Sequence, residues 1–173
     1  MVYRRIYDSL LVHTDPELAH EIAVAAISRA GRIELSRRSL AATIGRLGEP
    51  VRNPRLLVFP RPIPGHLGLA AGMDKNAEAV LGMAALGFGF VEIGTVTAYA
   101  QPGNEKPRSW RHPDIEGLRN RMGFNNAGAT VVAERLRKLR ASAAGRAVVV
   151  GANIGKTKVT PLAGAVDDYL AST

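Results

Sequence analysis

Small, amide and cationic residues recur where buried apolar runs give way to turns. The run Leu67–Ala71 leads into Gly72, Met73, Asp74 and Lys75. Small residues let a flat ring lie against the backbone, and a lysine beyond them can stabilise negative charge that develops on that ring. A tight turn with a solvated Lys75 is the alternative. The tract fits neither a P-loop nor a dinucleotide-binding glycine fingerprint.

Two later apolar runs end in the same way. Glu92-Ile-Gly-Thr-Val-Thr97 offers Thr95 as a hydroxyl donor or acceptor toward a heterocycle, and Gly151-Ala-Asn-Ile-Gly-Lys156 offers the amide of Asn153 on a turn flanked by glycines. Each tract by itself is weak evidence. Three successive runs that end in small or amide residues indicate a shared binding edge.

The tract Asn120-Arg-Met-Gly-Phe-Asn-Asn126 holds three asparagines, an arginine and a glycine in seven residues, which is a poor composition for a core. Asparagine amides and an arginine suit a planar ligand with imide and carboxylate groups. Two interpretations stay open, a ligand clamp and a polar capping loop.

Other chemistries find little support. His13, His20, His66 and His112 are scattered, and the spacing Glu17-x-x-His20 has no second set of ligands, so no metal is expected. The sequence has no cysteine and no Gly-x-Ser-x-Gly elbow, which disfavours thiol and serine-hydrolase chemistry and favours a reducing compartment.

The elements that must position these residues alternate in type. The patterns predict β-α-β-α-β order, and thus parallel strands joined by helices, with a long polar loop over residues 97–128. The strands are expected at 67–71, 90–94 and 147–154, and the helices at 77–86 and 130–140. A doubly wound sheet and a (β/α)8 barrel both fit this order.

Residues 1–46 have a helical pattern of their own. Asp15, Pro16 and Glu17 predict the start of a helix that runs from Pro16 to Arg29, with Gly31 as its stop, and a shorter helix precedes it. These helices could pack on a core or lie on a bilayer. Residues 47–66, rich in proline, predict a linker that contains an edge strand over Leu56–Phe59.

The charge is strongly positive, with a formal net charge of +8 and a pI near 10.4. Arginines crowd the first forty residues, and only 5% of the residues are aromatic, so few rings could stack on bases. An anionic membrane surface is therefore preferred to nucleic acid as a partner. Charged residues interrupt every apolar stretch near the N-terminus, so neither a signal peptide nor a spanning helix of about 20 residues is expected.

Taken together, four tracts resemble those of the dihydroorotate dehydrogenases in order and spacing: Gly68–Lys75, Glu92–Thr97, Gln101–Arg108 and Asn120–Asn126. The helical N-terminal part resembles class 2, the membrane-associated, quinone-dependent group. This resemblance implies an α/β fold, in which residues 67–173 form the first three strands of a (β/α)8 TIM barrel. It also implies that residues 1–46 form a small helical domain with a tunnel for the quinone.

The resemblance further implies a flavoprotein oxidoreductase of pyrimidine (UMP) biosynthesis, with FMN as cofactor and dihydroorotate, orotate and a membrane quinone as partners. A base would take a proton from C5 of dihydroorotate while hydride passes from C6 to the flavin. By their matching positions, FMN would contact Ala71, Gly72, Met73, Asp74, Lys75, Thr95 and Asn153. The substrate would contact Lys75, Asn120, Arg121, Met122, Gly123 and Phe124, and the quinone tunnel would contain His20 and Arg111.

The family's catalytic serine belongs to a tract that would lie beyond Thr173, and Ser172 does not match it. A full barrel takes about 250 residues. The 173 residues alone are therefore expected to be inactive, as a piece of an enzyme found on the cytoplasmic side of the cell membrane. The alternatives are a truncated, non-catalytic peripheral membrane protein and a soluble class 1 enzyme, the latter disfavoured because class 1 lacks the helical extension.

Overall fold

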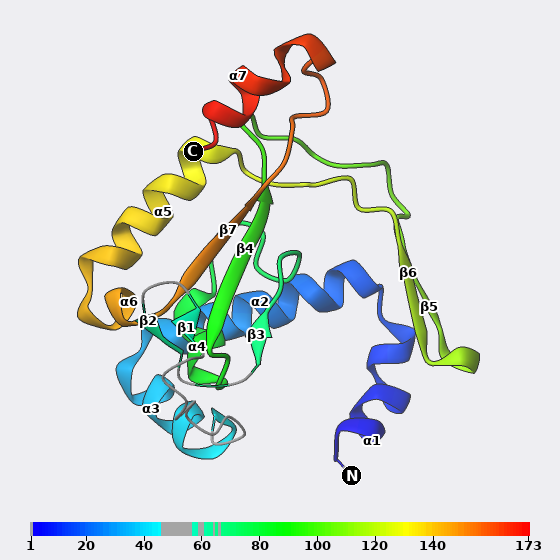
Figure 1. Cartoon of the computed structure of the whole chain (residues 1–173). Helices are drawn as coiled ribbons and strands as arrows, with labels where there is room; N and C mark the ends of the chain where they lie inside the picture. The colour runs from blue at the N-terminus through cyan, green and yellow to red at the C-terminus, as the bar shows by residue number, and fades with distance from the viewer. Residues whose placement is uncertain (1, 46–56, 59–60, 64, 66) are drawn as a thin grey trace.

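The computed structural model describes residues 2–45, 57–58, 61–63, 65 and 67–173 (Figure 1). The helices are α1 (Val2–Ser9), α2 (Pro16–Arg32), α3 (Glu34–Thr43), α4 (Val80–Ala85), α5 (Ala129–Ala141), α6 (Ala143–Ala147) and α7 (Ala165–Leu170), with short 3-10 turns at Leu11–His13, Pro113–Ile115 and Leu162–Gly164. The strands are β1 (Leu57–Val58), β2 (Arg61–Pro62), β3 (Gly68–Leu69), β4 (Phe90–Val96), β5 (Ser109–His112), β6 (Gly117–Asn120) and β7 (Val150–Ile154).

The first turn of α2 forms as its sequence predicts. Asp15 Oδ1 accepts hydrogen bonds from the backbone N–H groups of Glu17 (3.0 Å) and Leu18 (2.9 Å), and Pro16 occupies the first helical position, where no N–H is needed. The predicted end at Arg29 is wrong, because α2 continues through Gly31 to Arg32.

Gly31 serves packing rather than helix termination. A Cβ at this position would lie 2.5 Å from the backbone nitrogen of Gly82 in α4, so only glycine lets the two helices approach this closely. Ser28, one turn earlier, donates a hydrogen bond of 2.6 Å to the carbonyl oxygen of Glu78. The helix α2 is therefore fastened to the α/β part of the chain.

The main sheet has the order β3-β4-β7, and its three strands are parallel. This confirms the predicted β-α-β-α-β order. Val91 and Ile93 of β4 are fully buried, and they pack with Met83 of α4 and Val132 of α5 in one hydrophobic core. Apolar burial of this kind is the main force that holds helices against a sheet.

The third strand begins later than predicted, at Val150 rather than at residue 147. Residues 143–147 form the short helix α6, and the hydroxyl oxygen of Ser142 accepts the backbone N–H of Gly145 at 3.0 Å. Serine at this position favours a helix start over continued strand. The first strand is also shorter than its apolar run, since only Gly68–Leu69 pairs with β4.

The segment 97–128 is more ordered than the predicted loop. Strands β5 and β6 form an antiparallel hairpin in which Trp110 lies opposite Arg119. The guanidinium groups of Arg119 and Arg121 lie 5.1 and 5.6 Å from the centre of the Trp110 ring. The hairpin stands off from the sheet on the side of α1 (Figure 1). Its sequence is polar, and its cross-strand contacts include guanidinium groups stacked on an indole ring, which a search for alternating apolar residues does not detect.

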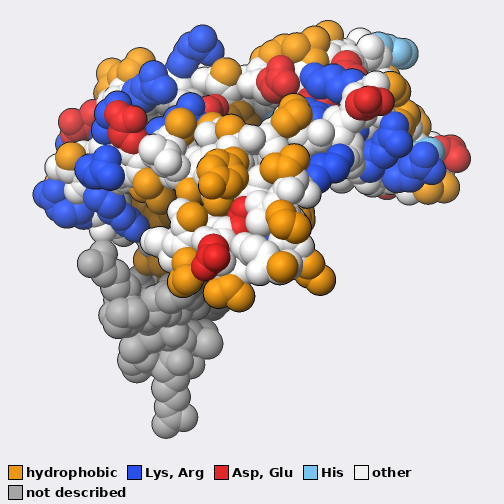
Figure 2. Space-filling view, turned by 90° about the horizontal axis from the view of Figure 1, so that it is seen from above, with side chains coloured by type: hydrophobic (Ala, Val, Ile, Leu, Met, Phe, Trp, Pro, Cys, Tyr) orange, Lys and Arg blue, Asp and Glu red, His pale blue; other side chains and the backbone are white. Residues whose placement is uncertain are grey.

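Of the predicted edge strand Leu56–Phe59, the structure describes Leu57–Val58, which pairs with β2 in a separate two-stranded sheet; Leu56 and Phe59 lie outside the described residues. Within the described part of the chain, no helix is long and apolar enough to cross a membrane. Figure 2 looks down on the α7 end and shows hydrophobic side chains exposed across the middle of that face, with Lys and Arg side chains toward its two ends.

Candidate functional site

The carboxyl ends of the three parallel strands meet at one edge of the sheet. The backbone N–H of Gly72, in the turn after β3, donates to the carbonyl oxygen of Gly94 in β4 at 2.8 Å. The hydroxyl of Thr95 donates to Oδ1 of Asn153 in β7 at 2.7 Å. Parallel strands bring their carboxyl ends to the same edge, so residues far apart in sequence become neighbours there.

Thr95 and Asn153 are held in a short hydrogen-bonded chain. The Asn153 amide nitrogen donates in turn to Oε1 of Glu92 at 3.2 Å. Both side chains are half-buried on the sheet. Their orientation is therefore fixed before any ligand binds, which suits polar groups that must meet a rigid ring.

In the turn after β3, Asp74 has a structural task. Its side chain is buried, and its two carboxylate oxygens accept the backbone N–H groups of Glu78 and Ala79, each at 2.8 Å. These bonds satisfy N–H groups just ahead of α4. The carboxylate of Asp74 is therefore engaged within the protein, which leaves the backbone of this residue for the expected cofactor contact.

Lys75 joins the first strand end to the asparagine tract. Its ammonium nitrogen donates to Asn125 Oδ1 at 2.6 Å, and the side chain is half-buried. Burial lowers the pKa of Lys75 below its ordinary value of 10.5, and the charge of Arg108 lowers it further, whereas Glu17 acts in the opposite direction. Lys75 is a cation that is poorly solvated in this structure.

Two small cavities open beside Lys75. One, of about 170 Å³, is lined by His20, Gly72, Lys75, Asn120 and Met122 among others. A neighbouring cavity of about 220 Å³ is also lined by His20, Lys75 and Met122, and by Met73, Asp74 and Asn125. The structure thus brings together predicted FMN, substrate and tunnel residues around one lysine.

Other predicted site residues lie outside these cavities. Arg121 stacks on Trp110 and donates to the Pro107 carbonyl oxygen at 3.3 Å. Gly123 and Phe124 have positive φ angles of 77° and 55°, and the Phe124 side chain is exposed. The tract therefore splits, with Asn120 and Met122 facing the cavities and the residues after Met122 forming a bend.

Two asparagines have roles that the sequence analysis did not predict, since the expected substrate contacts ended at Phe124. Asn125 holds Lys75, as described above. Asn126 is buried, accepts the backbone N–H groups of Thr97 (3.2 Å) and Gly128 (2.9 Å), and donates to Thr97 Oγ1 at 2.8 Å. Asn126 therefore fastens the tract to the end of β4. The sequence feature that could have revealed both residues is their position in the same asparagine-rich tract.

His20 and Arg111 lie at the contact of α2 with the β5–β6 hairpin. Arg111, on β5, donates to the carbonyl oxygen of Thr14, just before α2. His20 is half-buried; burial lowers its pKa below the ordinary 6.5, and the charge of Lys75 lowers it further, against the opposing effect of Glu21 and Glu17. A neutral imidazole at neutral pH follows from this direction.

A buried ion pair beside the cavities was also missed. Glu17 accepts from Arg108 through both carboxylate oxygens, at 2.5 and 3.0 Å, and Lys106 lies 3.5 Å from the same carboxylate. The hydrogen bonds from Arg108 hold the pKa of Glu17 below its ordinary 4.5, although burial acts to raise it. The pair joins α2 to the segment that leads into β5. Among the described residues, no group of three or more histidine and carboxylate side chains could hold a metal ion.

Comparison with known proteins identifies the family of the chain. A family model described as dihydroorotate dehydrogenase matches residues 58–173. The chain belongs to the dihydroorotate dehydrogenase family. It is 47% identical to the dihydroorotate dehydrogenase (quinone) of Thermobifida fusca over 99% of this chain and 45% of that protein, and 48% identical to that of Kineococcus radiotolerans over 98% and 46%. The chain spans about half the length of these relatives.

Solved structures of the dihydroorotate dehydrogenase family have the same fold. A crystal structure of the Eimeria tenella enzyme in complex with ferulenol is 37% identical, with a TM-score of 0.69, over 95% of this chain and 42% of that one. The ligand-free form from the same organism is 41% identical, with a TM-score of 0.60, over 89% and 40%.

Proposed function

We propose that this chain provides the FMN- and dihydroorotate-binding edge of a quinone-dependent dihydroorotate dehydrogenase, which oxidises dihydroorotate to orotate in pyrimidine biosynthesis. The observation that carries the proposal is the hydrogen bond of 2.6 Å between Lys75 and Asn125. It joins the strand-end turn expected to hold a flavin to the asparagine tract expected to hold the substrate. Family membership and the relatives named as quinone-dependent support the choice of reaction.

In this proposal, β3, β4 and β7 are the first three strands of a (β/α)8 barrel. Their parallel order and the helices between them support it. Residues 67–173 would belong to the barrel, residues 1–46 to a helical domain, and residues 47–66 to the linker between them. Barrel enzymes gather their sites at the carboxyl ends of the strands, which is where Gly72, Thr95 and Asn153 lie.

The strand ends suit FMN. Gly72 is exposed with a φ angle of 109°, and a Cβ there would meet no atom within 4 Å, so open space lies over the backbone. Lys75 stands beside that space, and Thr95 and Asn153 present polar groups at the neighbouring strand ends. Ala71, Gly72, Met73, Asp74 and Lys75 would hold the cofactor together with these two. The chemistry that bound FMN would supply is electron transfer between dihydroorotate and a quinone.

The protein's own groups would bind and polarise the substrate. The ammonium of Lys75 would stabilise negative charge that develops during oxidation, and its partial burial strengthens that interaction. The amide of Asn120 faces the same cavity, and the backbone from Arg121 to Phe124 would contribute further contacts. We assign no catalytic base among residues 1–173.

The quinone would approach between α2 and the β5–β6 hairpin. His20 lines the cavities next to Lys75, and Arg111 is fixed by its bond to the Thr14 carbonyl oxygen. Ile6 and Leu10 on the α1 side and Leu18 and Ile22 on α2 are exposed apolar side chains. With the neighbouring arginines they suit a peripheral contact with an anionic membrane on its cytoplasmic side.

The test uses the purified protein expressed from its complete gene. We expect the visible absorption bands of bound flavin, which bleach when dihydroorotate is added without oxygen and return when a quinone follows. The variant Lys75→Met should not bleach, whereas Lys158→Met, which removes an exposed lysine, should behave like the original protein. A flavoprotein that dihydroorotate does not reduce contradicts the proposal. A colourless protein that binds membranes would favour a non-catalytic peripheral membrane protein.

A further inference from the structure

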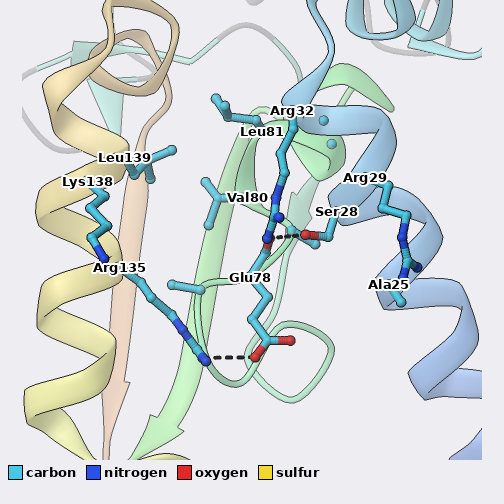
Figure 3. A pocket seen from close by; sticks show the side chains of 14 residues that line it. Ala25, Ser28, Arg29, Arg32, Glu78, Val80, Leu81, Arg135, Lys138 and Leu139 are labelled. Atoms are coloured by element: carbon cyan, nitrogen blue, oxygen red, sulfur yellow. Dashed lines mark hydrogen bonds and ion pairs between the residues drawn. The ribbon is translucent and has the colours of Figure 1, made fainter.

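A cavity of about 600 Å³ lies away from His20 and Lys75, between α2 and α5. Figure 3 shows its two walls, α2 with Ser28 and Arg32 on one side and α5 with Arg135 and Lys138 on the other. The residues of segment 77–82 form its floor. This volume is within the range of small-molecule sites, roughly 300–1,000 Å³.

The charges of the lining are strongly unequal. Four cationic side chains line the cavity, Arg29, Arg32, Arg135 and Lys138, against the single carboxylate of Glu78. Glu78 is already paired with Arg135 at 2.9 Å. The Glu78 carboxylate therefore neutralises Arg135 of α5. It does not neutralise Arg29 and Arg32 of α2.

The two arginines of α2 lack a counter-ion in the part of the chain that the structure describes. No hydrogen bond or ion pair joins the side chain of Arg29 or Arg32 to another described residue, while Lys138 bonds Glu134 at 2.7 Å. Both arginines lie in the last turn of α2, where the helix dipole favours positive charge. The helix dipole explains why two arginines are favourable at the end of α2. It does not explain why they face two further cations, Arg135 and Lys138, across the cavity.

We propose that this cavity binds a small phosphorylated organic molecule through its phosphate monoester. Guanidinium groups match phosphate oxygens in a planar, two-point geometry, and several cations around one site favour a dianion over a carboxylate. The half-buried apolar side chains of Leu81 and Leu139 also line the cavity and can pack against the organic part of the ligand. The same phosphate chemistry occurs in soluble metabolites and in phosphatidic acid, and the test separates these two sources.

The experiment measures binding by titration calorimetry on the full-length protein with three probes: inorganic phosphate, phenyl phosphate, and phosphatidylcholine vesicles with and without phosphatidic acid. We expect phenyl phosphate to bind more tightly than inorganic phosphate. The double variant Arg29→Gln/Arg32→Gln should bind phenyl phosphate at least about tenfold more weakly, because it loses two charged hydrogen bonds. The matched control is Arg38→Gln/Arg137→Gln, which removes the same charge outside the cavity and should change affinity less than about twofold.

Binding of the soluble phosphates that depends on Arg29 and Arg32 supports a metabolite site. Binding only to the vesicles that contain phosphatidic acid, again dependent on Arg29 and Arg32, supports the site and identifies a lipid as the source of the phosphate. Absence of binding to every probe, or equal weakening in the two double variants, overturns the proposal. The readout does not involve flavin or dihydroorotate, so its failure leaves the proposed enzyme function untouched. Unchanged circular dichroism of the variants guards against loss of folding.

Discussion

The carboxylate of Glu17 and the guanidinium of Arg108 form a buried two-point ion pair between residues 91 positions apart, with their side chains only 8% and 7% exposed. Glu17 belongs to the first turn of α2, and Arg108 precedes β5, so the pair fixes the helical part of the chain against the hairpin. Lys75 is sensitive to both charges, which act on its pKa in opposite directions. The pair thus holds together the segments around the candidate site and also influences the pKa of Lys75 there.

Breaking this pair should destabilise the protein strongly. Arg108→Met leaves the Glu17 carboxylate buried with only the exposed Lys106 beside it, and we expect a loss of about 3 kcal/mol in the free energy of unfolding. The exposed pair between Arg38 and Glu34 provides the control, since Arg38→Met should cost less than about 1 kcal/mol. Urea unfolding measures both. Equal effects of the two variants would contradict the role of Arg108.

The same pair predicts a loss of stability in acid. The folded pKa of Glu17 is lowered, so its contribution is complete above the ordinary value of 4.5 and is lost as pH falls through the lower folded value. Unfolding free energies measured across that window should fall more steeply for the original protein than for Glu17→Gln. Parallel curves for the two proteins would contradict the assignment of this effect to Glu17.

Lys75 should lower the free energy of unfolding of the protein, although we propose that it takes part in substrate binding. Its pKa is lowered, so below 10.5 the unfolded chain binds the proton more tightly, and stability should rise with pH between the folded value and 10.5. We expect Lys75→Met to gain about 1 kcal/mol near neutral pH and to lose part of this rise, because it removes a partly buried charge at a candidate functional site. Lys158→Met is the control. If Lys75→Met is less stable than the original protein, its bond to Asn125 outweighs the cost of burial.

His20 should stay neutral at a pH where a solvated histidine is half protonated. Its pKa is lowered by burial first and by Lys75 second, so stability should decline as pH falls below 6.5, where only the unfolded chain takes up the proton. Nitrogen NMR of the imidazole, assigned through His20→Gln, measures the pKa directly. In Lys75→Met it should rise toward 6.5. An unchanged value would mean that Lys75 does not act on His20.

Gly31 should tolerate no side chain, although it lies inside a helix. Alanine favours helix by about 1 kcal/mol over glycine in isolation. Here a Cβ would meet the Gly82 backbone at 2.5 Å, so Gly31→Ala should destabilise by about 1–3 kcal/mol as α2 is pushed from α4. Gly164→Ala, whose Cβ would lie 3.4 Å from Thr160, should change stability by less than about 0.5 kcal/mol. Thermal unfolding measures the stability of both glycine variants. An increase in stability for Gly31→Ala would contradict the close contact between α2 and α4.

The sequence predicted that the strand ends of the candidate site share one edge, but it did not predict the hydrogen bonds within that site. Gly72, Lys75, Thr95 and Asn153 follow apolar runs, so the sequence indicates their shared edge. That Asp74 caps α4, that Asn125 holds Lys75, and that Asn126 fastens the loop to β4 depends on which groups meet after folding. Asparagine and aspartate can cap, bridge or bind a ligand, and their residue type alone does not choose among these roles.

By itself, the sequence determined the order of elements, the start of α2 at Asp15 and the resemblance to a family, because apolar periodicity and helix capping are effects of near neighbours along the chain. Tertiary structure alone decided that α2 runs through Gly31, that Lys75 meets Asn125 from 50 residues away, and that Glu17 is buried with Arg108 from 91. The physical reason is that these features depend on close packing and on desolvation of paired groups, which arise only when distant segments have come together.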